Sequence, residues 1–61
     1  MSDPTTYCGL TLETYRMSFR EANRLYNEAI AADDLASIKR WFAERGRLIE
    51  IINNWRILTD A

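Results

Sequence analysis

A heptad pattern of apolar residues that begins at Leu12 and stops after Ala29 constrains this chain more than any other feature. Its steps alternate between three and four residues, the spacing of one face of an α-helix, through Leu12, Tyr15, Phe19, Ala22, Tyr26 and Ala29. The positions at which the pattern would continue are mostly charged, beginning with Asp33. We therefore predict a first helix over residues 12–32, with Thr11 as its N-cap, and a tight turn at 32–34.

A second helix is predicted over residues 35–58. Asp33 or Asp34 can cap its first turn, and Leu35 and Ile38 open its apolar face. Helices joined by a short connection pack as antiparallel neighbours. The sequence therefore predicts an all-α fold, in which a single domain over residues 1–61 forms an antiparallel helical hairpin after an irregular lead-in over residues 1–10.

Gly46 leaves an alternative open within the second helix. A glycine at this position either ends a helix, which would give three short helices with a break at Gly46, or lies inside one continuous helix, where it costs about 1 kcal/mol relative to alanine. We expect the continuous helix.

The segment LIEIINNWRIL, residues 48–58, has more apolar side chains than one neighbouring helix can cover. They spread over about 180° of the helix, whereas a helix with one neighbour needs a stripe of about 100°. A chain of 61 residues has a marginal core of its own. Its single cysteine, Cys8, excludes an internal disulfide, and the absence of histidine argues against a zinc site. We therefore expect a second subunit to cover the segment.

The expected assembly is a homodimer in which two hairpins form a four-helix bundle. The alternatives are a different protein partner, or a monomer in which the lead-in, with Tyr7 and Leu10, folds back as a lid. The residues predicted to lie at the protein interface follow the apolar seam of the second helix: Trp41, Arg45, Leu48, Ile51, Ile52, Trp55 and Leu58. Trp55 is the first choice for an intersubunit contact. Arg45 is expected to reach water along its alkyl stem or to meet a carboxylate inside the bundle.

No catalytic, cofactor-binding or metal-binding residues are predicted. The chain has no histidine for acid–base chemistry, and most of its glutamates lie three or four positions from an arginine, which is typical of solvated pairs within a helix. Cys8 is expected to be a neutral, partly buried side chain. We therefore expect neither enzymatic activity nor a small-molecule substrate.

The charge pattern argues against nucleic-acid and membrane partners. The net charge is −1, and the longest aliphatic run, residues 29–32, is far shorter than a membrane span. One basic feature remains, a ridge formed by Arg16, Arg20 and Arg24 at steps of four residues, which suits phosphates or an acidic protein. A single unpaired cysteine and no export signal indicate a cytoplasmic protein.

These observations predict a small, non-enzymatic protein–protein interaction module. It would associate with itself, dock on a larger partner as an adaptor, inhibitor or assembly factor, or do both. Its size suits an accessory protein of a phage or bacterium. The alternative is a small nucleic-acid-binding regulator that uses the arginine ridge.

Overall fold

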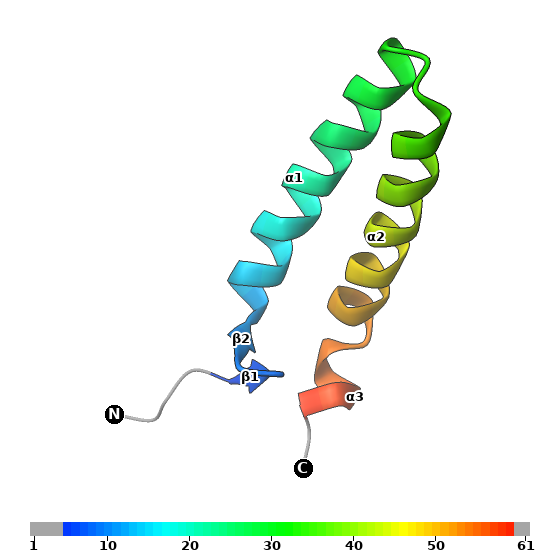
Figure 1. Ribbon diagram of the computed structural model, residues 1–61. Helices are drawn as coiled ribbons and strands as arrows, with labels where there is room; N and C mark the ends of the chain where they lie inside the picture. Colours follow the sequence, from blue (N-terminus) through cyan, green and yellow to red (C-terminus); the bar gives the residue numbers. More distant parts are fainter. Residues whose placement is uncertain (1–4, 60–61) are drawn as a thin grey trace.

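The computed structural model describes residues 5–59, which are 80% helical. Two long helices, α1 (Leu12–Ala31) and α2 (Leu35–Asn53), pack side by side as an antiparallel hairpin (Figure 1). A short helix, α3 (Trp55–Thr59), and two short strands, β1 (Thr6–Tyr7) and β2 (Leu10–Thr11), lie at the end of the hairpin opposite the turn, which we call the base. The hairpin of two long helices is therefore confirmed.

Local hydrogen bonds explain where α1 begins. Thr11 is the N-cap, and its hydroxyl oxygen accepts a hydrogen bond from the backbone N–H of Thr14 over 3.3 Å. This bond satisfies one of the N–H groups that the first turn of a helix leaves without a partner. The predicted N-cap is confirmed.

The turn between the long helices joins a C-terminal motif of α1 to the N-cap of α2. Asp33 adopts a left-handed conformation with φ +55°, and the N–H groups of Asp33 and Asp34 donate to the carbonyls of Ile30 and Ala29 over 3.1 and 3.0 Å. This is the Schellman arrangement, which satisfies the last carbonyls of a helix. Asp34 then caps α2, and its carboxylate accepts hydrogen bonds from the N–H and the hydroxyl of Ser37. The turn lies where the sequence predicts it, with α1 ending one residue earlier, at Ala31.

The second long helix runs through Gly46 without a break, so the alternative of a break at this glycine is wrong. The prediction that the helix continues to residue 58 is also wrong, because α2 ends at Asn53. The backbone leaves helical geometry at the C-cap, Asn54 (φ −104°, ψ +16°), where the backbone N–H and the side-chain amide both donate to the carbonyl of Glu50, over 3.0 and 2.8 Å. An asparagine side chain that bonds to the backbone competes with the helix. The chain therefore changes direction at Asn54, and α3 begins at Trp55.

The lead-in, predicted to be irregular, contains a small β-hairpin. Tyr7 pairs with Leu10 and Thr6 with Thr11 in antiparallel register, around a turn at Cys8 and Gly9. Both turn residues have positive φ, +55° and +81°, as a type I′ turn requires. The turn projects Cys8 into solvent, so the expectation that its side chain is partly buried is wrong.

The core of the hairpin is small. Among residues 5–59, only four are buried: Tyr15, Ala22, Ala29 and Leu48. The structure measures 47 × 19 × 15 Å, so it is about two helices wide and one helix thick. A single layer of two helices covers only the facing sides of each, which leaves much of the apolar surface of α2 open.

Candidate protein interaction surface

Most of the predicted interface residues pack within their own chain. Leu48 is only 2% exposed, and Trp41, Ile51, Ile52 and Trp55 are partly buried against the core that it forms with Tyr15 and Ala22. Leu58 is exposed at the base. The side of α2 that contains Leu48 therefore faces α1. Most of the residues predicted to contact a partner instead contact the hairpin's own core.

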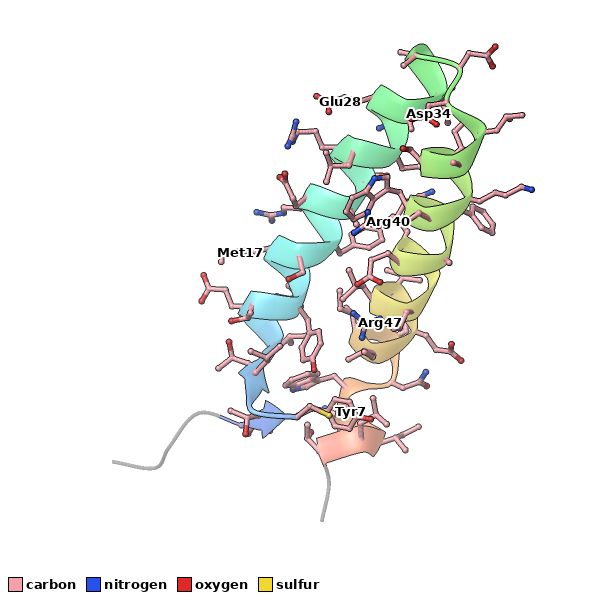
Figure 2. All side chains as sticks on the ribbon, in the orientation of Figure 1. Tyr7, Met17, Glu28, Asp34, Arg40 and Arg47 are labelled. Carbon is pink, nitrogen blue, oxygen red and sulfur yellow. The ribbon has the colours of Figure 1, made fainter. Side chains whose placement is uncertain are left out.

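Trp55, the first choice for an intersubunit contact, belongs to an aromatic cluster at the base. Its ring lies edge-on to that of Tyr15, with 5.5 Å between the centroids, and the rings of Tyr15 and Tyr7 are 6.4 Å apart. The hydroxyl of Tyr15 donates to the carbonyl of Tyr7 over 2.9 Å, and burial raises the pKa of this hydroxyl. Tyr7 thus packs back on the hairpin, beside α3, as expected for a lid, whereas Leu10 stays exposed (Figure 2).

An open groove of about 730 Å³ lies at the base. Its apolar rim consists of exposed side chains from the β-hairpin and α3, namely Leu10, Ile57 and Leu58. Glu44 and Arg47, which form an ion pair on α2, supply its polar wall, and this pair lowers the pKa of Glu44. Apart from Leu48, Ile51 and Leu58, the predicted interface residues do not line this groove.

A second exposed apolar surface runs along α2. Leu35, Phe42 and Ile49 are 68%, 64% and 37% exposed, and they lie seven residues apart, so they share one side of the helix. We call them the α2 stripe. At about 100° per residue, this side is turned roughly 100–140° away from that of Leu48. Sequence reasoning missed the stripe because it traced the seam through Trp41 and Leu48, although the seven-residue spacing was a signal that could have revealed it.

The middle of the α2 stripe borders a small hollow of about 230 Å³, which reaches across to α1. Its lining is mostly apolar and consists of Phe19, Phe42, Arg45, Gly46 and Ile49. A side chain added at Gly46 would meet no atom within 4 Å at its Cβ. The surface of α2 above Gly46 is therefore open.

Arg45 lies on the aromatic rings of α1. Its guanidinium carbon is 4.7 Å from the centre of the Tyr26 ring and 5.9 Å from that of Phe19, distances suited to cation–π attraction. Its Nε atom is buried, with no hydrogen-bond partner among the residues described. The expected carboxylate partner is thus replaced by two aromatic rings of the same chain.

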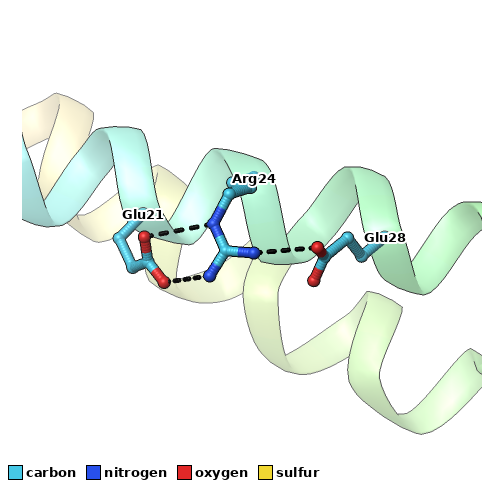
Figure 3. Close-up of polar contacts among 3 residues, drawn as sticks. All are labelled: Glu21, Arg24 and Glu28. Carbon is cyan, nitrogen blue, oxygen red and sulfur yellow. Dashed lines mark hydrogen bonds and ion pairs between the residues drawn. The ribbon is translucent and has the colours of Figure 1, made fainter.

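The arginine ridge of α1 is exposed, but one of its three charges is already balanced. Arg24 forms ion pairs with Glu21 and Glu28, the latter over 2.8 Å (Figure 3). The pair with Arg24 lowers the pKa of Glu21. A phosphate approaching this ridge would meet two carboxylates beside Arg24, so the ridge offers less positive charge than its sequence suggests.

The part of the chain between residues 5 and 59 contains no cluster of three or more side chains suited to hold a metal ion. Within the same range, no helix combines the length and apolar character needed to cross a membrane. Comparison with known protein families, curated proteins and solved structures finds no match.

Proposed function

We propose that this chain is a non-enzymatic helical protein–protein interaction module that functions by burying the α2 stripe against another helical chain. The observation that carries this proposal is the exposure of Leu35, Phe42 and Ile49 in register on one side of α2. Soluble monomers seldom leave a continuous apolar surface open, and such surfaces mark interaction sites.

The energetics of so thin a fold support this role. A domain of 61 residues is stabilised by about 3–9 kcal/mol in total, at 0.05–0.15 kcal/mol per residue. Covering one large apolar side chain contributes about 1.5–3 kcal/mol. Burial of the stripe is therefore comparable with the stability of the whole hairpin, so association and folding should be coupled.

The partner we favour is a second copy, giving a homodimer in which two hairpins form a four-helix bundle with two-fold symmetry. The alternative is a larger protein on which the hairpin docks as an adaptor, inhibitor or assembly factor. The single unpaired Cys8 suits an intracellular setting, where thiols stay reduced.

Light scattering over a dilution series, with circular dichroism at each concentration, tests self-association. We expect dimers in the micromolar to millimolar range and a loss of helix content on dilution. Phe42→Gln should shift the equilibrium towards monomer, whereas Met17→Gln, a change at an exposed site that points away from α2, should not (Figure 2). A well-folded monomer at every concentration would refute self-association.

A further inference from the structure

We infer that the occupant of the α2 stripe is the α2 helix of a second copy, running antiparallel, with each Phe42 packed over the partner's Gly46. This inference rests on the self-association proposed above and specifies its geometry. The protruding and recessed positions of α2, and the positions of its charges, support it.

Shape complementarity favours this register. The ring of Phe42 lies 6.1 Å from that of Tyr26 in its own chain but is still 64% exposed. One turn further along the helix, Gly46 lacks a side chain, and the space above it is open. A two-fold axis midway between Phe42 and Gly46 places each protruding ring over the partner's recessed glycine. The contact is thus made twice, as an interface with two-fold symmetry requires, and each ring enters the kind of hole that packed helices provide for a neighbour's side chain.

The same axis determines what meets the rest of the stripe. Residues equally distant from the midpoint lie opposite each other, so Ile49 meets the partner's Lys39, next to the partner's Ile38. The alkyl stem of a lysine can cover an apolar side chain while its charge stays in water. Leu35 meets the partner's Asn53, where α2 ends. The register therefore covers the stripe from one end of α2 to the other.

Charge complementarity also selects the antiparallel arrangement. Lys39 and Glu50 are exposed on the outer edge of the stripe, near opposite ends of α2. The proposed register brings Lys39 beside the partner's Glu50, and the symmetry repeats the pair. A parallel arrangement in register would instead place like charges together. Arg45 does not disturb the contact, because its guanidinium lies over the rings of its own α1.

Charge reversal tests this geometry. Lys39→Glu alone and Glu50→Lys alone should each dimerise about tenfold more weakly than the wild type, because each change places like charges opposite each other twice. An equimolar mixture of the two variants should form heterodimers with wild-type affinity, since one charge pair then keeps its original sense and the other is restored in reversed sense. Native mass spectrometry separates the heterodimer from the homodimers once one variant is uniformly labelled with ¹⁵N, because the unlabelled variants are almost equal in mass.

Two further variants test the hole at Gly46. Gly46→Gln should weaken dimerisation, because the new side chain occupies the space of the partner's Phe42. At concentrations where both proteins are monomeric, its helix content should be no lower than that of the wild type. Met17→Gln adds the same side chain at an exposed position on the side of α1 that faces away from α2, and it should leave dimerisation unchanged.

The outcomes separate the geometry from the proposed function. A wild-type dimer whose charge-reversed variants do not complement each other, or that tolerates Gly46→Gln as well as Met17→Gln, would overturn the antiparallel register alone. A wild-type protein that remains monomeric would overturn the proposed self-association together with the register.

Discussion

Replacement of Leu48 by alanine is the most direct test of how the hairpin is held together. Leu48 is 2% exposed and is the only buried residue of α2 in the described chain. Truncation of a buried leucine to alanine costs about 2–5 kcal/mol, because apolar contacts are lost and a cavity remains. The whole chain is stabilised by only about 3–9 kcal/mol. Leu48→Ala should therefore remove between a quarter and all of the stability.

Urea denaturation followed by far-ultraviolet circular dichroism measures this effect. All variants must be compared at one chain concentration, because association adds a stabilisation that depends on concentration. Met17→Ala is the matched control, since Met17 is exposed on the side of α1 that faces away from α2. This surface change should alter the free energy of unfolding by no more than about 0.5 kcal/mol. If Leu48→Ala cost no more than Met17→Ala, the proposed core would be wrong.

Three further predictions concern a helix interior, a helix cap and the arginine ridge. Gly46→Ala should stabilise the monomer by about 1 kcal/mol and raise its midpoint of thermal unfolding by about 4–8 °C. The reason is that alanine favours the helix and that its Cβ meets no atom within 4 Å. A lower midpoint would show that the site needs glycine. Hydrogen bonds from Ser37 hold the pKa of Asp34 below its ordinary value of 3.8. The ionised carboxylate therefore stabilises the fold at neutral pH. This stabilisation is lost as the pH falls from 3.8 through the lower pKa of the folded state. Asp34→Asn keeps a cap that does not titrate, so its acid unfolding curve should be less steep, and identical curves would contradict this role for Asp34. Titration with mixed-sequence duplex DNA should give no salt-sensitive binding; binding that a triple change of Arg16, Arg20 and Arg24 to alanine abolishes would instead favour the nucleic-acid-binding regulator.

The sequence predicts those parts of the fold that depend on short-range chemistry. The apolar spacing from Leu12 to Ala29 defines one side of α1, the hydroxyl of Thr11 caps it, and adjacent aspartates at the turn end one helix and begin the next. Each of these features arises from residues within a few positions of one another. For that reason they could be identified before any packing was known.

Two local features were missed because their signals are weak. The β-hairpin uses Cys8 and Gly9 rather than the asparagine–glycine or aspartate–glycine pair that usually marks such a turn, and its strands are only two residues long. At the end of α2, the side chain of Asn54 bonds to the carbonyl of Glu50. A periodic apolar pattern that continues past Asn54 conceals this bond.

Only the tertiary structure decides which apolar side of α2 is core and which is surface. The sequence places apolar residues around about half of this helix, so α1 could have packed on either part of that surface. The packing of Trp55 on Tyr15 and of Arg45 on Tyr26 turns the side of Leu48 inward. Phe42 touches Tyr26 only at the edge of this contact and stays largely exposed. These contacts join residues far apart in the chain, and periodicity within one helix carries no information about them.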